Sequence, residues 1–328
     1  MNPTLNIGIL GCAQIAGRMV IPALIELQDL FSVVGVASRN AEKVEAFADQ
    51  HELKAYTGYE SLLDQPGLDA VYIPLPNALH SAWIDKALDR GLHVIVEKSL
   101  ECTAEEVERL CQLAEKKGLV LLENFQFRCH PQLQTIKEII DTGRIGDLRC
   151  MRSSFGFPPF PDESNIRYNK SLGGGALLDA GAYTLKVSQI ILGADLEVAS
   201  ANLWYDPERE VDIWGGAYLQ QKDGPLFSEV AFGFDQQYQC SLELWGSKGR
   251  LTTNRLFTAP AGYSPELLIE SGMDKEVVKV NPENHFKAML RHFHALVNGQ
   301  ANREDEYAQN INQARLIAEV FAKAKAST

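Results

Sequence analysis

The chain has 328 residues, of which 45% are apolar and 23% are charged, as in an ordinary globular protein with room for two domains. Its net charge of −12, without a dense run of lysine or arginine, argues against nucleic-acid binding because a phosphate backbone would be repelled. Scattered cysteines, no signal-peptide pattern and no membrane-length apolar run predict a cytoplasmic protein without a disulfide framework, a zinc motif or a membrane contact.

Apolar strand-like runs alternate with helical segments from residue 5 to about residue 122. The strand candidates are residues 5–10, 31–37, 69–73 and 92–96, and the first helical segment covers residues 14–27. The last two strands are nearly continuous apolar runs, as strands buried on both faces require. Repeated βα units predict a parallel, doubly wound sheet of the Rossmann type in a first domain, residues 1–122.

The pattern changes after about residue 145, where strands follow strands. The candidates are residues 147–157, 196–205, 211–221, 226–234, 238–245 and 249–255, several of them joined by short turns. One long helix, at about residues 175–192, interrupts this series, and two more helices finish the chain. We therefore predict an α+β second domain, residues 123–328, with a large and mostly antiparallel sheet.

A glycine motif follows the first predicted strand. It reads Gly11-x-Ala13-x-x-Ala16, so only the first glycine of the dinucleotide fingerprint is retained. Because the motif lies between a strand and a helix, the helix N-terminus can still receive phosphate groups. The predicted cofactor contacts here are Gly11, Ala13, Gln14, Ile15 and Ala16. The alternative is a tight turn that binds no ligand.

The second strand ends in Ser38-Arg39-Asn40, where an NAD-specific site would carry an acidic residue for the ribose hydroxyls. Arg39, together with Ser38 and Lys43, can instead hold the 2′-phosphate of NADP. The cofactor is predicted to be NADP or NAD, and these residues favour NADP. In the alternative interpretation Asn40 caps the next helix and its basic neighbours are solvated, and both can hold together.

Two later strands end at the same predicted edge of the sheet. The run Val94-Ile95-Val96-Glu97-Lys98 ends in a carboxylate and an amine where doubly wound folds bind ligands, so Lys98 is the first catalytic candidate. A surface Glu-Lys pair is the alternative. The preceding strand is followed by Pro74-Leu75-Pro76-Asn77 and His80. This loop can wall a nicotinamide ribose, or it can be a rigid turn in which Asn77 caps a helix.

In the second domain, Gly173-Gly174-Gly175 leads into a helix that carries Asp179 and Tyr183. These two side chains are four residues apart and so lie on one face, while the other faces are apolar. A carboxylate in such a helix is costly unless it is paired or faces a cleft, and the glycines permit a ligand to approach closely. We therefore predict a site here. The alternative is a solvated face with Tyr183 half buried.

Together the motifs resemble the glucose/fructose oxidoreductase and inositol dehydrogenase (Gfo/Idh/MocA) superfamily over essentially the whole chain. The resemblance is carried by Gly11 to Ala16, Pro74 to His80, Glu97-Lys98 and Gly173 to Tyr183. Within it, Glu123-Asn124-Phe125-x-Phe127, Ile166-Arg167-Tyr168 and Leu192 to Leu196 are most similar to nucleotide-sugar 3-ketoreductases and 3-dehydrogenases. Inositol dehydrogenases usually carry histidine in place of Tyr183. Ser99 departs from the family, whose Glu-Lys-Pro is here Glu97-Lys98-Ser99.

The resemblance implies an NAD(P)-dependent oxidoreductase that transfers a hydride at C3 of a nucleotide-activated sugar. The same site can reduce a 3-keto deoxysugar or oxidise the 3-hydroxyl of a sugar such as UDP-N-acetylglucosamine, so the direction stays open. The resemblance further implies that the second domain binds the substrate and forms a homodimer or homotetramer through its sheet. No metal is expected.

Residue roles follow from the same resemblance and from the chemistry of hydride transfer. Reduction leaves negative charge on the substrate oxygen, which Lys98 is expected to polarise while Tyr183 exchanges the proton. Glu97 is expected to orient Lys98, and Asp179 to orient Tyr183 or bind a hydroxyl. The other predicted contacts are Arg167 and Tyr168 with the substrate, and Glu97, Lys98 and Asn124 with the cofactor.

Three alternatives stay open. One is a trans-dihydrodiol, free-sugar or inositol dehydrogenase. Another is a non-catalytic dinucleotide-sensing regulatory protein, against which the presence of Lys98 argues. The third is a metal-dependent enzyme built on His285, His292 and His294, of which the last two point to different faces of one helix and so disfavour a shared metal.

Overall fold

The computed structural model describes residues 3–327 and divides into two compact units. The first unit contains the described residues up to Phe125 together with Phe286–Ile311, and the second contains Gln126–His285 and the chain from Asn312 onward. The sequence placed the boundary after residue 122 and assigned every later residue to the second domain. The structure differs in returning one C-terminal segment to the first unit.

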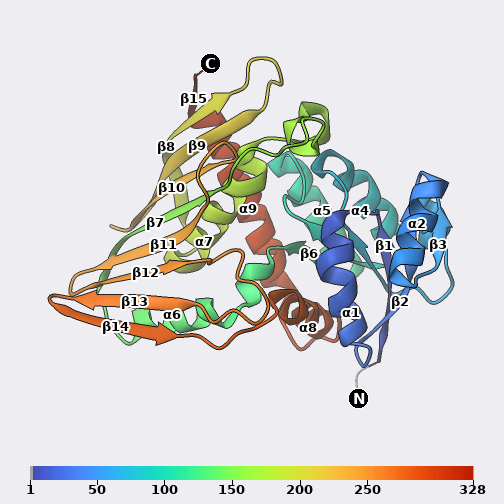
Figure 1. Cartoon of the computed structure of the whole chain (residues 1–328), viewed down its shortest axis with the longest axis horizontal. Coiled ribbons are helices and arrows are strands. Elements are labelled where there is room, and N and C mark those ends of the chain that lie inside the picture. The colour runs from blue at the N-terminus through green and yellow to red at the C-terminus, as the bar shows by residue number, and fades with distance from the viewer. Residues whose placement is uncertain (1–2, 328) are drawn as a thin grey trace. The chain divides into compact units, whose positions relative to one another are not determined.

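Six parallel strands form the sheet of the first unit, in the order β3-β2-β1-β4-β5-β6 (Figure 1). They are β1 (Leu5–Leu10), β2 (Phe31–Ser38), β3 (Ala55–Thr57), β4 (Ala70–Ile73), β5 (His93–Glu97) and β6 (Leu121–Asn124). The order reverses between β1 and β4, and ligands of doubly wound sheets bind beyond the carboxyl ends of the strands at such a point. The predicted Rossmann-type sheet is confirmed.

Most helices of the first unit lie in the connections between successive strands. They are η1 (Ala16–Val20), α1 (Ile21–Glu26), α2 (Ala41–His51), α3 (Tyr59–Leu63), η2 (Asn77–Leu79), α4 (His80–Asp89) and α5 (Ala104–Lys117), where η marks short π- or 3₁₀-helical turns. Asn40 caps α2, because its side-chain oxygen accepts a hydrogen bond from the Lys43 amide at 2.8 Å. At the C-terminal end of α5, Gly118 takes the left-handed conformation that ends many helices.

Nearly all of α8 (His285–Val297) and the first half of α9 (Arg303–Lys323) belong to the first unit. Lys287 Nζ lies 2.6 Å from the Glu26 carboxylate, and Asn310 donates to the Leu121 carbonyl at 3.2 Å. The sequence predicts an amphipathic helix over this segment, but periodicity does not tell which core the apolar face covers. In the structure the contacts of residues 286–311 group this segment with the first unit, whereas the predicted boundary places it in the second domain.

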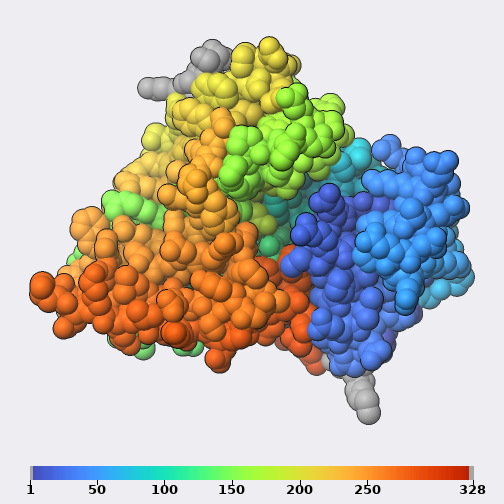
Figure 2. Space-filling model, viewed as in Figure 1, coloured from blue at the N-terminus to red at the C-terminus, as the bar shows by residue number. Residues whose placement is uncertain are grey.

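A nine-stranded sheet forms the second unit, in the order β14-β13-β12-β11-β7-β10-β9-β8-β15 (Figure 1). The strands are β7 (Leu148–Gly156), β8 (Leu196–Tyr205), β9 (Asp212–Gln221), β10 (Phe227–Gly233), β11 (Gln239–Gly246), β12 (Arg250–Asn254), β13 (Glu266–Ser271), β14 (Asp274–Lys279) and β15 (Ala324–Ser327). Only the pairs β7–β10 and β8–β15 are parallel, so the predicted mostly antiparallel sheet is confirmed. The edge hairpin of β13 and β14, orange to red in Figure 2, was not predicted.

Helices pack against one face of this sheet, whereas side chains on the other face such as Arg152, Glu229 and Glu243 are exposed or partly exposed. The helical segments of the second unit are η3 (Gln126–Cys129), α6 (Pro131–Asp141), η4 (Ile166–Tyr168), η5 (Lys170–Leu172), η6 (Leu177–Gly181), α7 (Ala182–Leu192) and the last part of α9. The hydroxyls of Ser188 in α7 and Ser228 in β10 are 2.9 Å apart. Along β10, Ser228, Val230 and Phe232 are buried whereas Glu229 and Ala231 are exposed, as strand alternation requires.

Candidate functional site

The turn after β1 has the strand-to-helix geometry that the glycine motif predicts. Gly11 has φ +133°, a conformation that favours glycine, and a Cβ atom there would lie 3.0 Å from Leu75 Cδ2, so that the Leu75 side chain would have to shift. Ala13 accepts a hydrogen bond from the Gly17 amide at 3.2 Å as η1 begins. Ala16 is buried beneath the turn, whereas Ala13, Gln14 and Ile15 are partly or fully exposed. The predicted cofactor contacts therefore lie on a single turn.

The residues predicted to hold a 2′-phosphate lie together at the end of β2. Ser38 is buried, and its hydroxyl accepts from the Asn40 amide at 3.4 Å. Arg39 and Lys43 are exposed at the N-terminus of α2. Asn40 thus caps the helix beside two cations, so the capping interpretation and the anion-binding interpretation are compatible.

Two residues missed by the sequence analysis flank these cations. Burial raises the pKa of the Cys12 thiol, while Lys43 and a hydrogen bond with Ser38 oppose the shift. Burial likewise raises the pKa of Tyr59, against the opposing effect of the Arg39 guanidinium beside its hydroxyl. Tyr59 reaches this position because β3 pairs with β2, so that the amide of the preceding glycine donates to the Ser38 carbonyl at 2.8 Å. No local sequence signal marks that contact.

Glu97 ends β5 and Lys98 follows it directly, and the Glu97 carboxylate is held by both neighbouring strands. Glu97 Oε1 accepts hydrogen bonds from the Tyr72 hydroxyl of β4 at 2.7 Å and from Asn124 Nδ2 of β6 at 2.6 Å. Burial raises the pKa of Glu97, while these hydrogen bonds and the Lys98 ammonium oppose the shift. Of the predicted residues, Glu97, Lys98 and Asn124 therefore lie together, and Tyr72 joins them as a residue that was missed.

The loop after β4 lies behind this strand end. Pro74 and Leu75 pack on the Gly11 turn, and Asn77 begins η2. His80 is completely buried, with its two ring nitrogens directed at the carbonyl oxygens of Leu75, Ser99 and Leu100. The peptide bond between Lys98 and Ser99, where the family carries proline, is cis.

In the second unit, Tyr183 and Asp179 lie on the predicted helix in different surroundings. The Tyr183 ring is 7% exposed and contacts the rings of Phe127, Phe155 and Phe257, with centroids 5.2–5.7 Å away. Asp179 Oδ2 accepts a hydrogen bond from Arg167 Nε at 2.5 Å. The structure therefore joins two predicted substrate contacts, Arg167 and Asp179, in a partly buried ion pair.

Tyr168, the other predicted substrate contact, holds the loop together. Its hydroxyl accepts from the Phe160 amide at 3.0 Å, and its ring packs on Phe234. The Arg209 guanidinium lies 4.4 Å from the ring centroid on another side. A shallow hollow of about 390 Å³ opens beside it, lined by Glu163, Ser164, Asn165, Tyr168, Asn169, Lys170, Ser171 and Arg209.

The N-terminus of the helix that carries Asp179 and Tyr183 is capped by a distant carboxylate. Asp212, only 2% exposed, accepts a hydrogen bond from the Leu177 amide at 2.6 Å. Burial raises the pKa of Asp212 to about 6, although the amides of Ala176 and Leu177 oppose the shift. No local pattern in the sequence marks Asp212, because it lies 35 residues from Leu177 in the chain.

The buried carboxylate predicts a pH-dependent term in stability. Since its folded-state pKa of about 6 exceeds the usual value, Asp212 stabilises the fold most below about pH 4, and this contribution is lost as the pH rises through 6. Asp212→Asn, which cannot ionise, is the reference. We expect the difference in unfolding free energy, wild type minus Asp212→Asn, to be roughly 2–3 kcal/mol smaller at pH 7 than at pH 4. Urea unfolding at several pH values measures it. A difference that does not change with pH would contradict the assignment.

The histidines considered for a metal site have separate partners. His292 Nε2 lies 2.7 Å from the Glu306 carboxylate, His294 Nε2 lies 3.2 Å from the Pro3 carbonyl, and the His285 ring contacts that of His130. Within the described part of the chain, no group of three or more His, Cys, Asp or Glu side chains is arranged to hold a metal. No helix among residues 3–327 has the length and apolar character needed to cross a bilayer.

Comparison with known proteins places these residues in a family. A family model described as an oxidoreductase family with an NAD-binding Rossmann fold matches residues 5–125, and the GFO/IDH/MocA C-terminal domain matches residues 133–252. Over 325 residues the chain is 38% identical to dTDP-3,4-didehydro-2,6-dideoxy-alpha-D-glucose 3-reductase of Actinomadura kijaniata, covering 99% of this chain and 96% of that protein. A protein of the same name from Saccharopolyspora spinosa is 41% identical over 270 residues, which are 82% of this chain and 80% of that protein.

This chain is also similar to a solved structure over the length of both units. The 3-ketoreductase from Actinomadura kijaniata in complex with NADP and TDP-benzene has a TM-score of 0.94 and 38% identity, with 99% of each chain covered. The predicted superfamily and the predicted likeness to nucleotide-sugar 3-ketoreductases are therefore confirmed. The chain belongs to the Gfo/Idh/MocA family of oxidoreductases.

Proposed function

We propose that this protein is an NADP-dependent oxidoreductase that reduces the 3-keto group of a nucleotide-activated deoxysugar. The observation that carries the proposal is the Glu97-Lys98 pair at the carboxyl end of β5, with the Glu97 carboxylate held by Tyr72 and Asn124. The same chain matches relatives named as dTDP-sugar 3-reductases over nearly its whole length, which supports the choice of substrate. Oxidation of a 3-hydroxyl by the same residues is the reverse reaction.

The residues of the first unit fit a phosphorylated dinucleotide. The turn from Gly11 to Ala16 opens into a helix, and Arg39 and Lys43 stand exposed at the N-terminus of the 11-residue α2. We assign the pyrophosphate to the first turn and the 2′-phosphate to Ser38, Arg39 and Lys43. When bound, NADPH supplies the hydride. The remaining roles belong to the side chains of this protein.

Lys98 is the proposed cation for the substrate oxygen. Hydride arrival at the ketone carbon places negative charge on that oxygen, and an ammonium already held nearby stabilises the charge without reorganisation. Glu97 can hold Lys98 by charge because its own carboxylate cannot turn away while Tyr72 and Asn124 donate to it. Glu97 is thus a positioning residue for Lys98.

Tyr183 is the proposed proton donor. Its three phenylalanine neighbours provide an apolar wall that disfavours the phenolate left after proton transfer, so the donor needs a cation close by. We propose that Lys98 and Tyr183 act on the same substrate oxygen, the ammonium by its charge and the phenol by its proton. Arg167, whose direction is fixed by Asp179, is proposed to bind the diphosphate or the sugar, with Tyr168 supporting its loop.

Replacing Arg39 by alanine tests the cofactor assignment. We expect the Kd for NADPH to rise about 10- to 100-fold, because a charge-assisted contact with the 2′-phosphate is lost. The Kd for NADH should change by less than about threefold, since NADH lacks that phosphate. Nicotinamide fluorescence titration measures both constants, with Arg18→Ala as an exposed control in the same unit. An equal loss for the two cofactors would contradict the assignment.

Turnover with defined sugars tests the proposed reaction. Purified protein is supplied with NADPH and an enzymatically generated dTDP-3,4-didehydro-2,6-dideoxyglucose, and the absorbance of NADPH is followed. In parallel, NADP⁺ is supplied with UDP-N-acetylglucosamine, D-xylose or a trans-dihydrodiol. Oxidation of NADPH by the keto sugar alone is the expected result. Reduction of NADP⁺ by a free sugar or a diol would replace the proposal with the dehydrogenase alternative, and cofactor binding without any turnover would favour a sensor.

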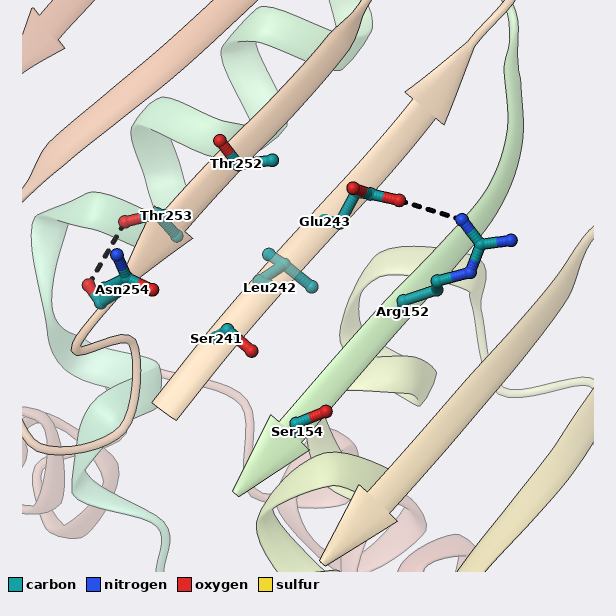
Figure 3. Close-up of a pocket in the computed structure, with 8 residues that line it drawn as sticks. All are labelled: Arg152, Ser154, Ser241, Leu242, Glu243, Thr252, Thr253 and Asn254. Carbon is teal, nitrogen blue, oxygen red and sulfur yellow. Dashed lines mark hydrogen bonds and ion pairs between the residues drawn. The ribbon is translucent and has the colours of Figure 1, made fainter. Parts of the chain in front are cut away.

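We also propose that the exposed face of the second-unit sheet forms a homodimer or homotetramer interface, in a cytoplasmic protein whose described cysteines are free thiols. Alternating charges cross that face, from Glu229 through Arg152, Glu243, Arg250 and Glu270 to Lys275. Figure 3 shows Arg152 directed toward Glu243. Both side chains line a hollow of about 410 Å³. Trp245, which is 53% exposed, lies beside Arg152 in this row of charges. Alternating charges suit a second copy of the same face, because each sign can meet its opposite.

Sedimentation velocity tests the interface. Arg152→Glu places like charges beside Glu229 and Glu243, so we expect the oligomer to shift toward monomer at micromolar concentration. The control, Lys222→Glu, makes the same change of charge in the turn between β9 and β10 and should leave the oligomer intact. A wild-type protein that sediments as a monomer would refute the interface.

A further inference from the structure

His80 occupies a position that the proposed reaction does not use. It begins α4, it is 0% exposed, and it makes three contacts with backbone carbonyl oxygens in the first unit. Nε2 lies 2.7 Å from the Leu75 oxygen, and Nδ1 lies 3.0 Å from the Ser99 oxygen and 3.1 Å from the Leu100 oxygen. One buried ring therefore lies between the loop after β4 and the turn that immediately follows Lys98. A protonated ring donates to the carbonyls on both sides, whereas a neutral ring donates on one side and packs against the other.

A second side chain holds the same turn from its amide side. Glu123 of β6, which is 2% exposed, accepts a hydrogen bond from the Leu100 amide at 2.9 Å. The carbonyls and the amide of the Ser99-Leu100 segment are thus both bound to buried side chains of neighbouring elements. Backbone groups buried without partners are costly, so these contacts restrict the turn to one path.

The loop on the other side of His80 is anchored as well. Leu75, whose carbonyl faces His80, packs on Gly11 so closely that a Cβ atom there would lie 3.0 Å from Leu75 Cδ2. His80 therefore connects the turn after Lys98 with the turn that follows β1. Burial, together with the Lys98 ammonium, lowers the pKa of His80, and the three carbonyl acceptors oppose the shift.

We propose that His80 is a positioning residue for Lys98, which fixes the backbone that carries the catalytic ammonium. This inference rests on the proposed function, in which Lys98 contacts the substrate oxygen. A displacement of a catalytic group by about 1 Å can cost about 100-fold in rate, so a lost backbone anchor is measurable.

The test compares His80→Ala and His80→Gln with a matched control, His93→Ala. His93 lies at the opposite end of β5, and its Nδ1 accepts a hydrogen bond from the Val120 amide at 3.0 Å. Its loss therefore removes a similar backbone contact without touching the turn after Lys98. Each variant is first checked for folding by circular dichroism and thermal unfolding.

Two measurements are made on each folded variant. Steady-state kinetics should give a kcat about 10- to 100-fold lower for His80→Ala, with a KM for the nucleotide sugar within about threefold of wild type. Reductive methylation of the protein without cofactor should change the labelling of Lys98 relative to Lys117 by at least about threefold, because the side chain explores new positions. His80→Gln, whose amide can still donate to one carbonyl, should fall between, and His93→Ala should match wild type in both.

Wild-type kcat and wild-type labelling of Lys98 in a folded His80 variant would overturn the inference. A uniform rise in the labelling of all lysines would overturn it too, because it would indicate general loosening. If His80→Ala does not fold, His80→Gln is judged by the same criteria. If the wild type turns over no nucleotide sugar, the proposed function fails, and the labelling ratio still decides whether His80 positions Lys98.

Discussion

Replacing Lys98 by alanine is expected to lower kcat for the keto sugar by about 100- to 1000-fold while NADPH still binds. The reason is that a cation close to an oxygen that gains negative charge is worth several kcal/mol in the transition state, and much less in the ground state. Neighbouring groups are expected to stay in place, because Glu97 keeps its hydrogen bonds with Tyr72 and Asn124. Single-turnover absorbance measures the chemical step, and a fluorescence titration measures the Kd for NADPH.

Tyr183→Phe is the companion variant, since it removes only the hydroxyl and keeps the ring among Phe127, Phe155 and Phe257. We expect a similar loss of kcat, because proton donation is worth about 100-fold or more. Lys117→Ala, at the C-terminal end of α5, serves as the lysine control. Near-normal turnover in both Lys98→Ala and Tyr183→Phe would contradict the mechanism.

Most of the fold could be predicted from the sequence, because the elements have strong local signals. The apolar runs at residues 5–10 and 196–205 coincide with β1 and β8 in the structure. The elements that were missed lack such signals: β3 has three residues, and β14 is a charged, almost fully exposed edge strand. For α8, the amphipathic pattern gives the helix, but not the unit whose core it covers.

Candidate site residues could be predicted where charged or polar side chains directly follow a strand or begin a helix. Glu97 and Lys98 stand out because two charged residues follow an apolar run at the edge where doubly wound sheets bind ligands. Tyr72 and Asn124 meet Glu97 only because β4 and β6 flank β5, and that follows from strand order rather than from any local pattern. The same holds for Asp212, which caps a helix from another strand.

Gly173, Gly174 and Gly175 precede the helix that carries Asp179 and Tyr183. The sequence interpretation was that their small size lets a ligand approach. In the structure a Cβ atom on Gly174 would lie 2.4 Å from the Arg167 carbonyl oxygen, and one on Gly175 would lie 2.2 Å from Asp212 Oδ1. The approach that requires glycine is thus made by the protein's own chain.

Gly175→Ala is therefore expected to lower the free energy of unfolding by about 3–5 kcal/mol. Two effects combine: Gly175 has φ +117°, where an L residue is strained, and the new methyl would clash with the Asp212 carboxylate that caps Leu177. Gly193→Ala separates the strain from the clash, because only the strain applies at that position. At the other end of α7, Gly193 has φ +95°, and no atom of the described residues beyond its chain neighbours lies within 4 Å of the place that a methyl would take, so that variant should lose only about 1–2 kcal/mol.

A double-mutant cycle then isolates the clash. Asp212→Ala loses the cap, but it also makes room for the methyl of Gly175→Ala. The double variant should therefore lose less unfolding free energy than the two single variants lose together, by at least about 1 kcal/mol. Urea unfolding followed by near-ultraviolet circular dichroism measures all four proteins. Strictly additive losses would show that the methyl does not meet Asp212. The glycine would then serve only the backbone conformation, and the position of the helix that carries Asp179 and Tyr183 would not depend on this contact.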